Sequence, residues 1–161
     1  MKSLLVFLLV SILSCSDISA QEFKTVKIDA VENILSNQND TLYVLNFWAT
    51  WCQPCIEELP YFEVMHDKFK NDKVKIILIS LDFSNVIDTR LKPFLEKKEL
   101  KSTIWLLDEK KANEYIPKVD DQWSGAIPFT VFSRGQDAVK DRKEGKLTQN
   151  ELEELISSKL N

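Results

Sequence analysis

The spacing of apolar positions changes repeatedly along residues 21–161. Short apolar runs rich in β-branched and aromatic residues predict strands, at 23–28, 41–49, 74–82, 102–108, 127–132 and 137–143. Segments in which apolar residues recur every three or four positions predict amphipathic helices, at 29–38, 52–70, 85–99 and 109–119 and from Thr148 onwards. Because strands and helices alternate, we expect an α/β domain whose mostly parallel central sheet has helices on both faces.

Three local features refine this prediction. The last two strands are separated by a short turn, so they predict a hairpin that makes the sheet mixed. Pro60 and Pro93 fall inside predicted helices, where we expect a kink and an interruption, respectively. Thr148 and Glu151 have the spacing of a capping box, which predicts that the last helix begins there.

The first twenty residues have a different character. Lys2 precedes an apolar run from Leu4 to Leu13, which is shorter than the roughly 20 residues that span a bilayer. This pattern is typical of an export signal. Cleavage after Ala20 is one expectation, but "ILSC" resembles the lipobox of bacterial lipoproteins, in which Cys15 would be lipid-modified and would tether the protein to a membrane. We therefore divide the chain into an export signal, 1–20, and one domain, 21–161.

Composition and charge exclude several classes of function. Apolar residues make up 44% of the chain and charged residues 29%, as in ordinary soluble domains. The net charge of −4 and the scattered lysines and arginines argue against nucleic-acid binding. With three glycines and no G-x-G or G-K-[ST] pattern, a nucleotide site of a familiar kind is not expected. We expect no cofactor, and a monomer is the default because no segment resembles a dimer interface.

Cys52 and Cys55 lie where a buried strand gives way to a long helix. A helix N-terminus favours an anion, and only the thiolate form of cysteine attacks a disulfide. Cys52 is therefore placed to be a nucleophile, and Cys55, one turn deeper, to resolve the mixed disulfide.

Two other roles for the cysteine pair are weaker. A closed zinc site needs four ligands, and the single histidine, His66, lies about 16 Å further along the helix, so we expect no metal site of this kind. A two-thiolate copper site remains an alternative. A purely structural disulfide would stabilise the fold little, because a bridge between positions this close in sequence closes almost no loop in the unfolded chain.

These residues resemble those of a known family. "FWATWCQPC" followed by Pro60 is similar to the W-C-x-x-C active site and mid-helix proline of the thioredoxin superfamily, and "IPFTVF" to its cis-proline loop. The resemblance covers about 22–160. Within the superfamily it is strongest to the exported TlpA/ResA-like branch, because of the signal, Asn46 where thioredoxin has a buried acid, and Glu58 where ResA-like proteins carry a glutamate near the disulfide.

The resemblance implies a thioredoxin-like fold and a redox-active Cys52–Cys55 disulfide. Trp51 would shield the active-site face, and Ile127 and Pro128 would present backbone groups to a substrate chain. Since Asn46 cannot accept a proton, Glu58 could take that role when Cys55 is deprotonated. A solvated carboxylate with no catalytic part is the open alternative for Glu58.

Aromatic residues near the motif need not be catalytic. Phe47 and Trp48 are expected in the core, and Trp123 either in the core or at the border of a substrate groove.

The predicted function is an exported thiol–disulfide oxidoreductase. Gln53 and Pro54 add no positive charge between the cysteines, which favours a reductant of protein disulfides, for instance before haem attachment in cytochrome c maturation. Such a protein is periplasmic or membrane-anchored on the extracytoplasmic side and needs a membrane thiol electron donor. The alternatives are a disulfide oxidase or isomerase on the same fold and a non-enzymatic copper chaperone. A peroxidase of the superfamily is less favoured, because it would not use W-C-x-x-C.

Overall fold

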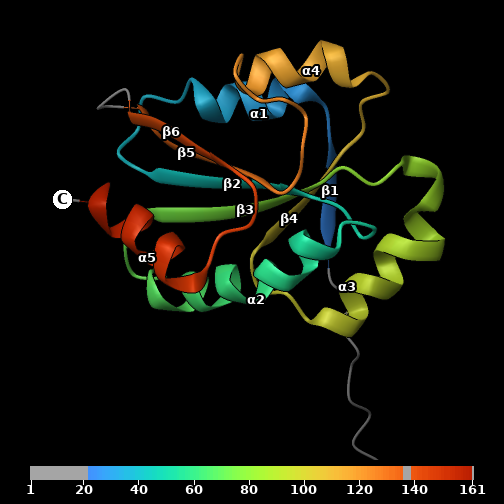
Figure 1. Ribbon diagram of the computed structural model, residues 1–161, viewed down its shortest axis with the longest axis horizontal. Coiled ribbons are helices and arrows are strands. Elements are labelled where there is room, and N and C mark those ends of the chain that lie inside the picture. Colours follow the sequence, from blue (N-terminus) through green and yellow to red (C-terminus); the bar gives the residue numbers. More distant parts are fainter. Residues whose placement is uncertain (1–21, 136–138, 161) are drawn as a thin grey trace, which may run out of the picture.

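The computed structural model describes residues 22–135 and 139–160 of the chain (Figure 1). In this part of the chain one six-stranded sheet has the order β1-β4-β3-β2-β5-β6. The strands are β1 Phe23–Val26, β2 Leu42–Trp48, β3 Val74–Ser80, β4 Thr103–Leu107, β5 Phe129–Arg134 and β6 Val139–Glu144. The helices are α1 Ile28–Leu35, α2 Gln53–Lys68, α3 Lys92–Lys98, α4 Ala112–Val119 and α5 Gln149–Ser158.

The sheet is mixed, as the sequence predicts. β1, β4, β3 and β2 are parallel to one another, whereas β5 is antiparallel to β2 and to β6. Helices α1 and α4 cover one face, and α2, α3 and α5 lie on the other (Figure 1). The α/β prediction with helices on both faces is therefore confirmed.

The central strand β2 separates the two halves of the core. Successive side chains of a strand point to opposite faces, and those of Val44 and Trp48 pack in the cluster that contains Cys55 and Leu59 of α2. Leu45 and Phe47 belong to the other cluster, with Val31 of α1 and Val119 of α4. Every residue of β2 except Tyr43 is buried, so the strand is a rigid base for the residues that follow it.

The segment predicted as one helix at 85–99 is broken into three parts. A 3₁₀ turn at Ser84–Val86 and a π-helical turn at Ile87–Leu91 precede α3. Pro93 lies in the first turn of α3, where its missing N–H has no helical partner to lose. A continuous helix would have lost a hydrogen bond there and placed the ring against an earlier carbonyl.

Pro60 lies inside a helix and the last helix begins at a capping box, as the sequence predicts. α2 continues through Pro60, and Thr148 and Glu151 form the predicted capping box at the start of α5. Helices and strands differ from their predicted bounds by a few residues at their ends. None of the helices among the described residues is long and apolar enough to cross a membrane. The predicted export signal and Cys15 lie outside the described residues.

Candidate active site

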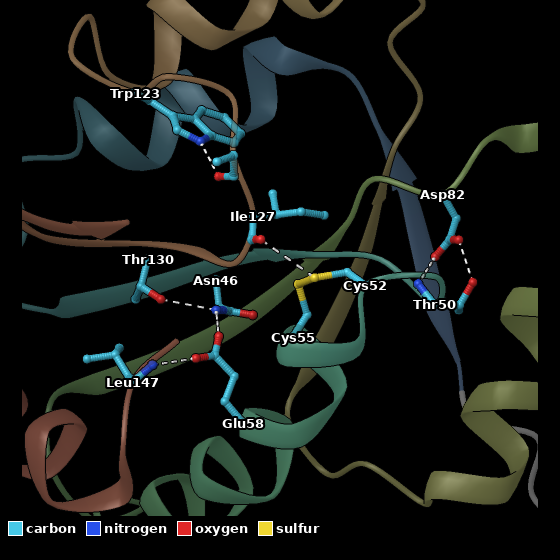
Figure 2. Close-up of a disulfide and its surroundings, with 11 residues drawn as sticks. Asn46, Thr50, Cys52, Cys55, Glu58, Asp82, Trp123, Ile127, Thr130 and Leu147 are labelled. Atoms are coloured by element: carbon cyan, nitrogen blue, oxygen red, sulfur yellow. Dashed lines mark hydrogen bonds between the residues drawn. A yellow bond between two sulfur atoms is a disulfide. The ribbon is translucent and has the colours of Figure 1, made fainter. Parts of the chain in front are cut away.

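A disulfide between Cys52 and Cys55 lies where β2 leads into α2 (Figure 2). Cys52 is the N-cap of α2 and has extended backbone angles, so the chain turns into the helix at this residue. The two Cα atoms are 5.3 Å apart. The structure thus brings together the two cysteines that the sequence marks as a redox pair, at the positive end of a 16-residue helix.

The two sulfur atoms differ in accessibility. Cys55 is fully buried, whereas Cys52 keeps 6% of its surface exposed. The Sγ of Cys52 lies 3.7 Å from the carbonyl oxygen of Ile127, and the Ile127–Pro128 peptide bond is cis, as the resemblance implies. An incoming sulfur can therefore reach Cys52 first, beside the backbone of the cis-proline loop.

A hollow of about 330 Å³ lies beside the disulfide at the carboxyl ends of β2, β3 and β4. Trp51, Phe83, Tyr115 and Ile127 supply its apolar wall. Trp51 is 57% exposed and Phe83 69%, which is unusual for such large apolar side chains. The sequence analysis missed Phe83; its place directly after a strand's carboxyl end, where ligands bind in open α/β sheets, was the available signal.

Asp82 was also missed, and it fixes the chain before the cysteines. It is 2% exposed. Its Oδ2 accepts a hydrogen bond from the Thr50 amide (3.0 Å) and its Oδ1 one from the Thr50 hydroxyl (2.6 Å) (Figure 2). Oδ2 also accepts a hydrogen bond from the Ser80 hydroxyl (2.8 Å). A carboxylate that accepts three hydrogen bonds holds Thr50 in place, and Thr50 directly precedes Trp51. Short-range patterns in the sequence do not show this contact.

Glu58 is buried, which contradicts its reading as a solvated carboxylate. It is 0% exposed. Its Oε1 accepts a hydrogen bond from Asn46 Nδ2 (2.8 Å) and its Oε2 one from the Leu147 amide (2.7 Å) (Figure 2). Its neighbour Glu57 is exposed and pairs with Lys146 instead.

Burial raises the pKa of Glu58 to about 7. Desolvation disfavours the charged carboxylate, while the hydrogen bonds from Leu147 and Asn46 and the charge of Lys146 favour it and limit the rise. Both protonation states are therefore populated near neutral pH, one helical turn from Cys55. A group of this kind can take up and release a proton without a large change in free energy.

Three further aromatic residues pack in the core. Phe47 and Trp48 are fully buried. Trp123 is 4% exposed and stacks on Phe129 at 4.5 Å between ring centroids. Its indole N–H donates to the Ala126 carbonyl (2.8 Å), so Trp123 supports the segment that leads to Ile127.

The only histidine is not part of the site. His66 lies in the last turn of α2, at the opposite end from the cysteines. Within 22–135 and 139–160, no group of three or more histidine, cysteine, aspartate or glutamate side chains is arranged to hold a metal ion.

Comparisons with known proteins place these observations in a family. Residues 17–140 match the AhpC/TSA family. Over 115 residues the chain is 31% identical to "Thiol-disulfide oxidoreductase ResA" of Oceanobacillus iheyensis, covering 71% of this chain and 55% of the relative. Over 114 residues it is 33% identical to the protein of the same name from Bacillus thuringiensis, covering 70% and 60%. The chain thus spans less than two thirds of the length of these two relatives.

Solved structures share the fold. The crystal structure of a thioredoxin-related protein from Neisseria meningitidis superposes with a TM-score of 0.65 over 78% of this chain and 89% of the other, at 23% identity. At this level of identity the comparison establishes a thioredoxin-like fold.

Proposed function

Because the chain belongs to the AhpC/TSA family, we propose that it is a thiol–disulfide oxidoreductase that reduces disulfides in protein substrates with the Cys52–Cys55 pair. The observation that carries this proposal is the pair itself: Cys52, at the N-terminus of α2, keeps 6% of its surface exposed, whereas Cys55 behind it is fully buried. The names of the two ResA relatives support the same chemistry.

The reaction is two successive thiol–disulfide exchanges. The Cys52 thiolate attacks one sulfur of the substrate disulfide, forms a mixed disulfide and releases the first substrate sulfur as a thiolate. Cys55 then loses its proton and attacks the sulfur of Cys52. This step forms the Cys52–Cys55 disulfide and releases the second substrate thiolate, so two electrons pass from the protein to the substrate.

Glu58 is the proton acceptor for Cys55 in this proposal. It lies one turn further along α2, on the same side of the helix, and its pKa of about 7 leaves it partly ionised at neutral pH. Asn46, which stands where thioredoxin has a buried acid, binds Glu58 but cannot accept a proton itself.

The substrate chain docks across Trp51 and the cis-proline loop. The carbonyl oxygen of Ile127 lies 3.7 Å from the Cys52 sulfur and can accept a hydrogen bond from a substrate backbone amide. Pro128 fixes this edge, while the hollow beside Trp51 and Phe83, which has an apolar wall and a charged wall that includes Asp108 and Lys110, accepts a side chain near the substrate cysteine.

The proposed cellular location rests on the N-terminal sequence rather than on the geometry of the site. The apolar run at 4–13 supports export, with Cys15 either lipidated or removed with the signal. A reductant outside the cytoplasm needs a membrane thiol donor to reduce Cys52–Cys55 again. Keeping substrate cysteines reduced before haem attachment is one role that fits, and the protein would act as a monomer.

Trapping of the mixed disulfide tests this function. With insulin as substrate, we expect the purified protein to reduce the interchain disulfides. Cys55→Ser should accumulate a mixed disulfide through Cys52, because the resolving sulfur is gone. Cys52→Ser should form none, and Cys15→Ser, the matched cysteine control, should retain full activity.

The same preparation separates the rival functions. Stoichiometric Cu(I) retention with no insulin reduction and no trapped adduct would indicate a copper chaperone. Oxidation of reduced insulin faster than reduction of the disulfide form would indicate an oxidase.

A further inference from the structure

The side chain of Asn46 lies between the buried carboxyl group of Glu58 and the disulfide (Figure 2). Asn46 is at the centre of β2 and is fully buried. It shares a strand face with Val44 and Trp48, whose cluster includes Cys55. Its amide is thus enclosed by the sheet and by the first turns of α2.

Two hydrogen bonds fix the orientation of this amide. Nδ2 donates to Glu58 Oε1 (2.8 Å) and to Thr130 Oγ1 (3.0 Å), which uses both of its N–H groups. A flipped amide would place Oδ1 against the Glu58 carboxylate, which is unfavourable. Oδ1 therefore points away from Glu58, and Figure 2 shows it directed towards the side of the cysteines.

The Asn46 carbonyl oxygen is an unused acceptor in the oxidised protein. Among the residues that the structure describes, none donates a hydrogen bond to Oδ1. Leaving a buried carbonyl oxygen without a partner disfavours the state in which this occurs. Cys55 cannot help in that state, because its sulfur is bonded to Cys52. Reduction by a dithiol donor, which becomes a disulfide itself, adds two electrons and two protons and gives Cys55 an S–H group, a weak donor.

We propose that Asn46 is a positioning residue whose carbonyl oxygen accepts a hydrogen bond from the Cys55 thiol when the disulfide is open. This bond favours the dithiol over the disulfide. It also favours the Cys55 thiol over its thiolate, since the partial negative charge of Oδ1 faces the sulfur. Cys55 thus stays protonated while Cys52 attacks. The Asn46 amide then contacts the Cys55 thiol through Oδ1 and the proton acceptor Glu58 through Nδ2.

Asn46→Leu removes the acceptor at nearly constant size. In glutathione buffers we expect its equilibrium to shift about two- to tenfold towards the disulfide, the range for one neutral hydrogen bond. We also expect a lower Cys55 pKa, followed by ¹³C chemical shift of the labelled cysteine. The other titratable groups of the site, Cys52 and Glu58, are followed in the same titration, because loss of the Asn46 bond also changes the environment of Glu58.

Thr130→Val is the matched control. It removes the other partner of the same amide but leaves Oδ1 in place. The equilibrium constant with glutathione should therefore stay within twofold of the wild-type value, and the Cys55 pKa should equal the wild-type value within experimental error. An equal shift in Thr130→Val, or no shift in Asn46→Leu, overturns the proposal.

A second measurement does not depend on the folding of Asn46→Leu. In a Cys15→Ser, Cys52→Ser background, the S–H stretching band of Cys55 should lie at the lower frequency of a hydrogen-bonded thiol. A band at the frequency of a free thiol overturns the proposal.

The inference rests on the proposed function only in that the disulfide must open. A wild-type protein that does not exchange with glutathione contradicts the proposed function. A wild-type protein that exchanges while Asn46→Leu matches it contradicts the role of Asn46 alone.

Discussion

At the scale of single residues, its environment is what suits Glu58 to the proposed role of proton acceptor. Its backbone position on α2 differs little from that of Glu57, yet Glu57 is solvated and Glu58 is enclosed by Asn46 and the Leu147 amide. Burial alone raises the pKa, and the two donors bring it back to about 7. The difference between the buried Glu58 and the solvated Glu57 therefore arises from contacts that are distant in sequence.

Glu58→Gln should slow the second exchange step. In single-turnover reduction of Ellman's reagent, the first release of coloured thiolate reports Cys52 and the second reports Cys55. Only ionised Glu58 accepts the Cys55 proton, so in the wild type the second rate should rise with pH through about 7. In Glu58→Gln this rise should disappear and the rate above pH 7 should fall roughly 100-fold, the lower range for general base catalysis.

Glu57→Gln is the control for that experiment, because it removes a carboxylate charge at an exposed position directly next to Glu58. Its second phase should match the wild type. If Glu58→Gln keeps the wild-type pH profile, Glu58 is not the proton acceptor.

At the scale of elements, the site depends on the junction between β2 and α2. β2 is buried almost throughout, and only four residues, Ala49 to Cys52, separate it from the first residue of α2, Gln53. Asp82, after β3, holds Thr50 of this junction by two of its three hydrogen bonds. Neighbouring strands of the sheet thus set the geometry of the loop that carries Trp51.

Asp82→Ala tests this role of the junction. The change leaves the half-buried Thr50 amide and the buried Ser80 hydroxyl without their acceptor, so we expect the free energy of unfolding to fall by about 2 kcal/mol. The first phase with Ellman's reagent should slow by roughly tenfold, as a displacement of reacting groups by even about 1 Å can cost more than that.

The capping residue of α5 supplies a control that also loses stability but lies outside the junction. Thr148→Ala removes a capping box and should cost about 1 kcal/mol, with both exchange phases unchanged. Urea unfolding and the thiolate assay together distinguish the two variants. An Asp82→Ala protein that loses stability but reacts at the wild-type rate would show that Asp82 serves the fold only.

At the scale of the whole molecule, the order of elements could be predicted from the sequence, whereas the enclosure of the site could not. The apolar patterns that predict β2 and α2 lie within short stretches of sequence, and so does the Cys52–Cys55 spacing. The two elements and the cysteine pair could therefore be predicted. Leu147 lies 89 residues from Glu58, and no local pattern shows that the two meet. The exposure of Phe83 likewise depends on which strand ends surround it.

The same limit explains the broken helix before α3. The apolar spacing at 85–99 fits a helix, but the position of Pro93 relative to a helix start is set by the packing of Leu91 and Leu95 against the core. Sequence periodicity indicates that such a segment faces the core and does not fix where its regular part begins.

The reduction potential of the Cys52–Cys55 pair tests the central claim most directly. The purified protein would be equilibrated with glutathione and dithiothreitol buffers, and its free thiols alkylated and counted by mass. The account predicts a value near or below about −250 mV, close to thioredoxin, for a protein that reduces its substrates. A value near about −120 mV, that of a strong oxidant, or a pair that forms no disulfide at all, would contradict it.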